Sequence, residues 1–385
     1  MRCCLSFLFV GVLTIPVFGQ SIPDAISSIK NVEQRGAGTT EAQAAAKILN
    51  AAQPSALPAI AKSMKGANPL AANWLRSAFE IIFDRAMKND LAVPQDSLLA
   101  FVKDTNGDPR ARRMVFEWLS KLDDKLPDRL IPNMLLDPSP EFRRDAVARF
   151  IDIAKKQNES GDKKAAKATF QKALSGAIHE DQVKAIVEPL EKLGTTVDVQ
   201  SHFGFIPNWN VIGPFDNRDK KGYPVAYPPE KEINLEKSYA SEYAKTKVSW
   251  KKFSTDDDYG IFDIAKKMKN HKGSVTYATT DYVSDSEKQA ELRLGTANAW
   301  KLWLNGELVF EREEYHRSTR MDQYKLSVKL KRGANRILLK VCQNEQDDDW
   351  AQRYHFQLRV CDATGSGLLP AVKKTISRTS AGVNE

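Results

Sequence analysis

The chain has 385 residues, of which 42% are hydrophobic and 28% are charged. This composition is that of a globular protein and does not favour intrinsic disorder, and the length predicts two or three domains. The formal net charge is +8, but acidic residues are interleaved with the basic ones along nearly the whole sequence. We therefore interpret the excess as a solvated basic surface, and not as a patch that recognises nucleic acid or an acidic polymer.

Residues 1–19 have the layout of a secretory signal peptide. A short basic start is followed by an apolar run from Cys3 to Phe18, and small residues then stand at the cleavage positions. The alternative is a membrane anchor, but the run is shorter than the ~20 residues that a spanning helix needs. We expect cleavage after Gly19 and an exported protein, periplasmic or extracellular, with no transmembrane segment after signal removal.

The next part of the chain carries two copies of one helical pattern, at residues 108–119 and 139–150. In each copy an N-capping Asp or Ser precedes a proline at the first helical position. An arginine pair and an apolar stripe at helical spacing follow. Residues 126–136 can form the facing helix of a pair, and the offset between the two prolines equals one helical-hairpin repeat.

This pattern resembles HEAT repeats, and the stretch that follows it resembles a tetratricopeptide helix pair. The second resemblance rests on Gly161, Ala166, Phe170 and Ala173. Together they predict an α-solenoid over residues 20–200, with an irregular helical bundle as the alternative. A solenoid offers an extended surface for a protein partner.

The arginine pairs of the two copies have two possible roles. They can contact a partner, or they can brace the neighbouring repeat against aspartates, and we favour bracing. The residues are Arg112, Arg113, Arg143 and Arg144.

From about residue 201 the helical spacing stops and strand patterns begin. The strands are predicted at residues 209–215, 247–253, 275–283, 291–294, 336–341 and 356–360. Asn305 and Gly306 predict a type I′ hairpin turn within residues 300–310. In that hairpin Trp303 would face Leu308 and Leu302 would face Val309, and we expect Trp303 to pack in a core. These patterns predict an antiparallel β-sandwich over residues 201–364 and a polar tail over 365–385.

Residues 299–306 and 328–341 resemble the galactose-binding-like jelly roll, and most of all the sugar-binding domain of family 2 glycoside hydrolases. The similarity is good over residues 285–362 and loose over 203–285. It implies a domain that binds rather than reacts. The whole arrangement, helical repeats and a jelly roll behind a signal peptide, also resembles exported proteins of planctomycete-type bacteria.

No catalytic motif stands out. The chain contains no G-x-S-x-G, H-E-x-x-H, P-loop, dinucleotide glycine fingerprint or C-x-x-C. Carboxylates are plentiful, so a hydrolase stays open, because a glycosidase needs only two of them at a set separation. We nevertheless predict a protein that is not an enzyme.

Two loops in the second half mix aromatic rings with charged hydrogen-bonding groups, as sugar-binding sites do. They span residues 313–320 and 344–350. The candidate ligand-binding residues are Tyr315, His316, Arg317, Arg320 and Trp350. The alternative is a pair of solvated loops whose aromatic residues pin them to the sandwich.

Two acidic runs, 256–258 and 347–349, are the candidates for a structural calcium ion. Asp347 and Asp349 are the calcium candidates that we name. Adjacent aspartates point in different directions and no EF-hand spacing is present, so no metal or other cofactor is assigned.

Two cysteines follow the signal peptide, Cys342 and Cys361, each at the end of a predicted strand. If the two strands form a hairpin closed near Asp348, the thiols lie ~20 Å apart along the strands. A disulfide needs Cα atoms within ~7 Å. We therefore predict two unpaired, buried thiols.

These observations predict an exported, non-catalytic protein that binds carbohydrate through its jelly roll. The alternative is a protein-interaction scaffold that uses the solenoid, with a purely structural sandwich. Nucleic acid is not among the expected partners.

Overall fold

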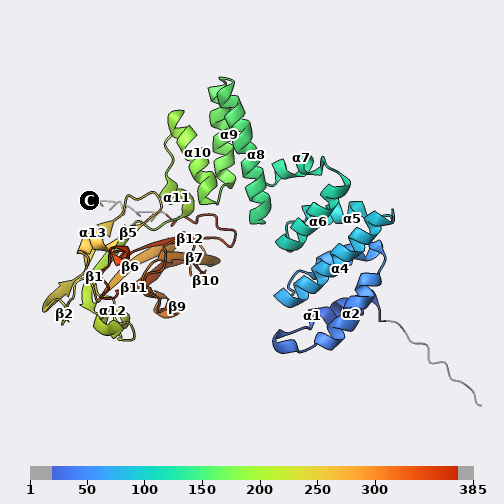
Figure 1. Ribbon diagram of the computed structural model, residues 1–385. Helices are drawn as coiled ribbons and strands as arrows, with labels where there is room; N and C mark the ends of the chain where they lie inside the picture. The colour runs from blue at the N-terminus through green and yellow to red at the C-terminus, as the bar shows by residue number, and fades with distance from the viewer. Residues whose placement is uncertain (1–19, 372–385) are drawn as a thin grey trace, which may run out of the picture. The chain divides into compact units, whose positions relative to one another are not determined.

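The computed structural model describes residues 20–371, so the predicted signal peptide and residues 372–385 lie outside the described residues. Backbone contacts divide the chain into two units, Met1–Phe150 and Ile151–Glu385. In the described part, helices lead up to Phe203 and strands begin at Asn208, so the protein is α + β (Figure 1). No helix between residues 20 and 371 has the length and apolar character of a membrane span.

The helices begin where the sequence places capping residues. Asp108 accepts hydrogen bonds from the backbone N–H groups of Arg110 and Ala111, and Pro109 occupies the first position of α6. The helices up to the first strand are α1 (Ile22–Lys30), α2 (Thr39–Ala51), α3 (Leu57–Ser63), α4 (Pro69–Lys88), α5 (Gln95–Lys103), α6 (Pro109–Leu122), α7 (Leu126–Leu130), α8 (Pro140–Glu159), α9 (Lys163–Gly176), α10 (Glu180–Lys192) and α11 (Val199–Phe203).

The predicted helices of the two copies are present as α6 and α8, but the facing helix at 126–136 is wrong in extent. It ends at Leu130, and a 3-10 turn follows over Ile131–Asn133. Pro132 explains the break, because it lacks an N–H and its ring would meet the carbonyl four residues earlier. In α9 the predicted contact residues Ala166, Phe170 and Ala173 are buried, while Gly161 lies in the turn before the helix.

Arg112 braces the helices of the first unit from inside. Its side chain is 0% exposed and donates two hydrogen bonds to Asp137, with N–O distances of 2.8 and 2.7 Å. Its Nε donates to the carbonyl oxygen of Val102 on α5 at 2.8 Å. Arg113 pairs with Asp145 on α8. These contacts support bracing as the role of this arginine pair.

Antiparallel strands build two sheets of a sandwich and a small outer ribbon. The orders are β4-β1-β6-β11-β8-β9, β10-β7-β12-β5 and β2-β3. The strands are β1 (Asn208–Asp216), β2 (Ser238–Ser241), β3 (Thr246–Ser249), β4 (Lys251–Ser254), β5 (Phe262–Asp263), β6 (Ser274–Ser284), β7 (Lys288–Thr296), β8 (Ala299–Leu304), β9 (Glu307–Arg312), β10 (Tyr324–Leu330), β11 (Gly333–Gln343) and β12 (His355–Cys361).

The main core lies between the six-stranded and four-stranded sheets. Because side chains alternate along a strand, every second residue of β11 and β12 enters it. The buried residues these strands contribute include Ile337, Leu339, Val341, Phe356, Leu358 and Val360.

A second core covers the outer face of the six-stranded sheet. Residues 217–250 leave the sheet after β1 and fold back over it, with α12 (Pro228–Lys231) and the β2-β3 ribbon. Tyr223 and Val248 of this excursion pack with Tyr277 and Leu338 of the sheet. The six-stranded sheet is therefore apolar on both faces, which explains why both faces of the 300–310 hairpin are apolar.

The predicted hairpin turn is confirmed, with φ of 55° at Asn305 and 91° at Gly306. Trp303 faces Leu308 as predicted, but Leu302 pairs with Phe310 and not with Val309, because the register shifts between Leu302 and Trp303. The predicted strand 247–253 is also wrong. It is two strands, β3 and β4, which pair in different sheets on either side of Trp250.

Cys342 and Cys361 are buried and unpaired, as predicted. The hairpin behind that prediction is wrong, because β11 belongs to the six-stranded sheet and β12 to the four-stranded one. Burial raises the pKa of Cys342 to about 12 and that of Cys361 to about 11. Both thiols stay protonated at neutral pH and are therefore poor nucleophiles.

Helix α11 is joined to the four-stranded sheet through Arg359 on β12. This guanidinium donates to the carbonyl oxygens of Phe203 and Gly365 at 3.1 and 2.9 Å and to both carboxylate oxygens of Asp322. Gly204 follows α11 with φ of 74°, and a Cβ there would lie 2.4 Å from the carbonyl oxygen of Val360. Only glycine allows this close approach of the chain to β12.

Replacing Asp137 with alanine is expected to lower the free energy of unfolding by about 3–5 kcal/mol, because the buried Arg112 would lose its counter-charge. Urea unfolding of the full chain, followed by circular dichroism, measures this change. The matched control is Asp123→Ala, which breaks the exposed Asp123–Arg129 pair and should leave the unfolding midpoint nearly unchanged. Equal effects of the two substitutions would contradict the bracing role.

Candidate functional site

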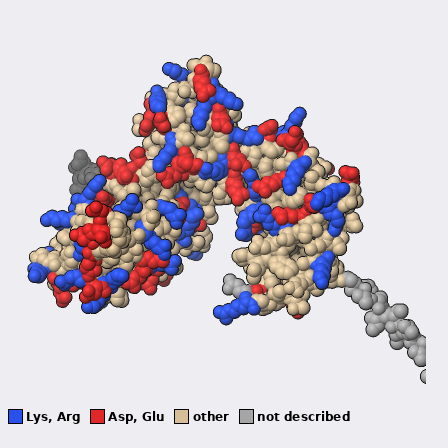
Figure 2. All heavy atoms as spheres, viewed as in Figure 1, with Lys and Arg blue, Asp and Glu red and all other residues tan. Residues whose placement is uncertain are grey.

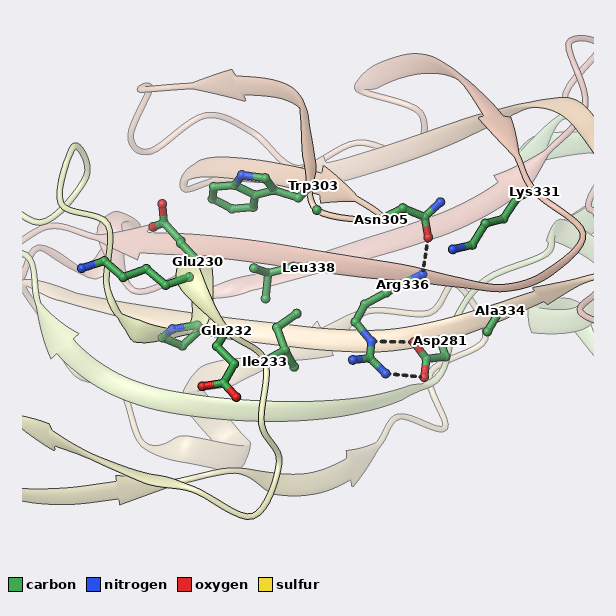
Figure 3. Close-up of a pocket in the computed structure, with 13 residues that line it drawn as sticks. Glu230, Glu232, Ile233, Asp281, Trp303, Asn305, Lys331, Ala334, Arg336 and Leu338 are labelled. Atoms are coloured by element: carbon green, nitrogen blue, oxygen red, sulfur yellow. Dashed lines mark hydrogen bonds and ion pairs between the residues drawn. The ribbon is translucent and has the colours of Figure 1, made fainter.

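A groove of about 460 Å³ lies on the outer face of the six-stranded sheet. One wall is the α12 segment of the excursion, and the floor and far end come from β6, β8 and β11 (Figure 3). The lining residues are Pro229, Glu230, Lys231, Glu232, Ile233, Asp281, Trp303, Asn305, Gly306, Lys331, Ala334, Arg336 and Leu338.

The strand register places the floor residues. Leu338 on β11 lies opposite Trp303 on β8, and Arg336 lies opposite Asp281 on β6. Because side chains alternate, residues 336, 338 and 340 of β11 all face outward. Trp303 is half-buried and packs at the edge of the second core. The expected core packing of Trp303 is therefore present against the second core, but burial is incomplete and part of the indole is open to solvent.

The polar end of the groove is built from an ion pair and a turn amide. Arg336 holds both oxygens of Asp281 at 2.8 and 2.9 Å, and this hydrogen bonding raises the pKa of Arg336. The Asn305 side chain accepts from the backbone N–H of Arg336 at 3.0 Å (Figure 3). It also donates to the Asn335 side chain at 3.1 Å. These groups are thus held in place before any ligand arrives.

A buried lysine fixes the opposite wall. Lys340 is 0% exposed, and its Nζ donates to the carbonyl oxygens of Tyr223 and Val225 at 2.9 and 2.7 Å and to Glu230 at 2.9 Å. Tyr277 donates its hydroxyl hydrogen to the same carboxylate. Burial, together with the charge of Glu230, raises the pKa of Tyr277, so the phenol keeps this proton. The wall of the groove is therefore bonded to the sheet beneath it.

The structure brings three of the five predicted ligand-binding residues together, outside the groove. The rings of His316 and Trp350 meet edge to face with centroids 5.1 Å apart, and the ring centroids of Tyr315 and His316 are 6.4 Å apart. His316 Nε2 lies 2.7 Å from the Asn344 side-chain oxygen, and the Tyr315 hydroxyl accepts from Asn217 at 3.2 Å. These contacts join the two loops to each other and to the sandwich.

The remaining two predicted residues, Arg317 and Arg320, line a separate hollow of about 560 Å³ together with His316 of that cluster. Arg317 is exposed and pairs with Glu314 at 3.3 Å, while Arg320 lines a hollow against the four-stranded sheet. Trp350 is 61% exposed.

The groove was missed at the sequence level, although two of its residues carried a signal. Trp303 and Asn305 belong to the hairpin that the sequence predicts most clearly. The α12 wall carried no such signal in the sequence, because the contacts that hold it against the sheet come from residues far away in the chain.

The acidic runs do not gather into a metal site. In the described residues no cluster of three or more His, Cys, Asp or Glu side chains is placed to hold an ion. Asp347 interacts with Gln352 and Lys272, and Asp257 accepts backbone hydrogen bonds from Tyr259 and Ile261.

No protein-family model and no curated protein matches the chain. Among solved structures, similarity is found to a β-glucosidase from Kluyveromyces marxianus, with 12% identity over 40% of this chain and 17% of that one and a TM-score of 0.26. A β-glucuronidase from an uncultured Clostridium sp. is 10% identical over 41% of this chain and 28% of that one, with a TM-score of 0.24. An alkylpurine DNA glycosylase from Pseudomonas fluorescens is 11% identical over 90% of this chain and 94% of that one, with a TM-score of 0.22.

The chain spans less than a third of the two glycosidases. TM-scores this low do not establish a shared fold, so the functional argument rests on the groove and its residues.

Replacing Glu230 with glutamine is expected to loosen the α12 wall and to lower the free energy of unfolding by about 3–5 kcal/mol, because Lys340 would stay buried without its counter-charge. Hydrogen–deuterium exchange should speed up in residues 223–233. The control is Glu232→Gln, which weakens an exposed pair with Lys237 and leaves the buried Lys340 with its counter-charge. Unchanged exchange in the Glu230 variant would show that the wall is held by other contacts.

Proposed function

We propose that this is an exported, non-catalytic protein that binds carbohydrate in the groove of its jelly-roll sandwich. The observation that carries the proposal is the half-buried Trp303, which lies on the floor of an open groove with Arg336, Asp281 and Asn305 fixed at one end. The helical part is, in this proposal, a solenoid.

The chemistry of the groove suits a sugar. A pyranose ring has C–H faces that pack on an aromatic ring and hydroxyls that need hydrogen-bond donors and acceptors. Trp303 and Leu338 offer the apolar surface, and the guanidinium, carboxylate and amide offer both kinds of hydrogen-bonding partner. Because these polar groups are already oriented, binding costs little side-chain ordering.

The same contacts support a role without catalysis. A glycosidase needs one carboxyl group to donate a proton and a second to act as base or nucleophile. Glu230 is engaged by Lys340 and Tyr277, and Asp281 is engaged by Arg336. Both carboxylates of these pairs thus already serve as counter-charges within the groove wall and its polar end.

Export is supported by the layout of residues 1–19. Mass spectrometry of the protein recovered outside the cytoplasm is expected to show a mature chain that begins at Gln20. Recovery of the full chain with Met1 from the cytoplasmic fraction alone would contradict export.

Glycan-array binding followed by titration calorimetry tests the groove. The Trp303→Ala variant is expected to bind the preferred glycan at least about tenfold more weakly, since it removes the stacking surface, a loss of about 1.4 kcal/mol. The matched control is Trp350→Ala, which removes an exposed tryptophan outside the groove.

The two tryptophan variants separate the possible outcomes. Loss of binding in the Trp350 variant alone would move the site to the loops at 313–320 and 344–350. Absence of binding to any glycan by the unaltered protein would rule out the carbohydrate proposal and favour the scaffold role.

A further inference from the structure

A second hollow lies on the outer face of the other sheet, the four-stranded one. Its volume is about 670 Å³. It is bordered by the N-terminus of α10, the loop that carries Tyr259, the segment 319–321 and the start of β12. All of these belong to the second unit. The lining residues are Glu180, Tyr259, Ile261, Thr319, Arg320, Met321, Arg353, His355 and Gln357.

Two arginines line the hollow, on a protein whose basic and acidic side chains are interleaved over the face shown in Figure 2. Arg320 and Arg353 reach it from separate segments, and among the described residues neither has a carboxylate partner. Glu180 is the carboxylate that lines the hollow, and it is paired with Lys184 at 2.6 Å. Burial lowers the pKa of His355, so the imidazole is neutral at pH 7 and adds no charge. Two exposed guanidinium groups facing one cavity form a site for an anion.

A buried amide in the hollow lacks a hydrogen-bond donor. Gln357 is 5% exposed, and its Oε1 has no partner among the described residues. Phe356 and Leu358 on either side belong to the core between the sheets, so the Gln357 side chain leaves the sheet on the outer face. A buried acceptor without a donor is rare. Oε1 has almost no exposed surface in this conformation, and a turn of the amide about its last bond would present it to a ligand hydroxyl.

The other wall of the hollow is apolar. Tyr259, Ile261 and Met321 line it, and the Lys184 ammonium lies 4.9 Å from the centre of the Tyr259 ring. Thr319 and His355 bond to each other at 2.6 Å, which leaves their ring and methyl surfaces as further packing area. A ligand that fits must therefore combine an anionic group, at least one hydroxyl and a compact body with C–H faces.

We propose that this hollow binds a sugar acid, a hydroxyl-bearing carboxylate of the uronic acid type. Arg320 and Arg353 hold the carboxylate, Gln357 Oε1 accepts a hydroxyl hydrogen, and the sugar body packs on Tyr259. This site is separate from the groove at Trp303 and does not depend on sugar binding there.

Calorimetric titration of the full chain with D-glucuronate and D-galacturonate, and with D-glucose as the neutral probe, tests the site. Arg320→Gln and Arg353→Gln are each expected to weaken binding of the preferred uronate about tenfold, because each removes a charge-assisted hydrogen bond. Gln357→Leu should weaken it as well. Glucose should bind to this hollow far more weakly than either acid.

Two control variants separate this site from the groove and from general charge effects. Arg332→Gln removes an exposed arginine in the turn between β10 and β11, outside both cavities, and should leave uronate binding unchanged. Trp303→Ala should also leave it unchanged. Thermal unfolding of each variant checks that the fold is kept.

Three results would overturn the proposal. They are no uronate binding by the unaltered protein, equal affinity for glucose and the uronates, and uronate binding that is lost in the Trp303 variant but kept in the arginine variants. The last result would place the acidic sugar in the groove and would support the proposed function while removing the second site.

Discussion

A buried ammonium group must be surrounded by oxygen atoms, and this requirement at Lys340 organises the second half of the protein. The lysine stands on the outer face of β11, where a bare sheet would leave it in water. The excursion between β1 and β4 instead brings two backbone carbonyls and Glu230 to it. Removing a charge from water is costly unless such partners are supplied. The position of the excursion over the sheet follows from that cost.

Once the excursion is fixed, the second core and the groove follow. Tyr223 and Tyr227 come to lie over Tyr277 and Phe215, and α12 becomes a wall facing Trp303. The second core covers Trp303 only in part, so its indole is half-buried. Trp300, three residues earlier on β8, faces the core between the sheets and is fully enclosed. The groove is thus the uncovered part of a sheet face that is otherwise packed.

The parts of this structure that the sequence predicts are the local ones. Asp108 and Pro109 mark the start of α6 by their own chemistry, and Asn305-Gly306 marks a turn because both residues tolerate positive φ. The sheet to which each strand belongs is not local. The alternation of apolar and polar residues in β11 and β12 predicts two strands. It fits a hairpin of the two strands as well as it fits strands in opposite sheets. The α12 wall is positioned by Lys340, more than a hundred residues later in the chain, so the candidate groove could not be assembled from sequence.

The junction at α11 bears on how the protein can be divided for study. A fragment that begins at residue 201, where strand patterns start, would remove Asp198, whose side chain caps α11. The short helix would fray, and the Phe203 carbonyl would no longer be held against Arg359. The Arg359 guanidinium would keep its bonds to Asp322 but lose the Phe203 carbonyl as an acceptor. This carbonyl precedes Gly204, where the chain approaches β12 too closely for any other residue. A sandwich that folds on its own therefore has to carry α11 with its cap, and its natural starting point lies before Asp198.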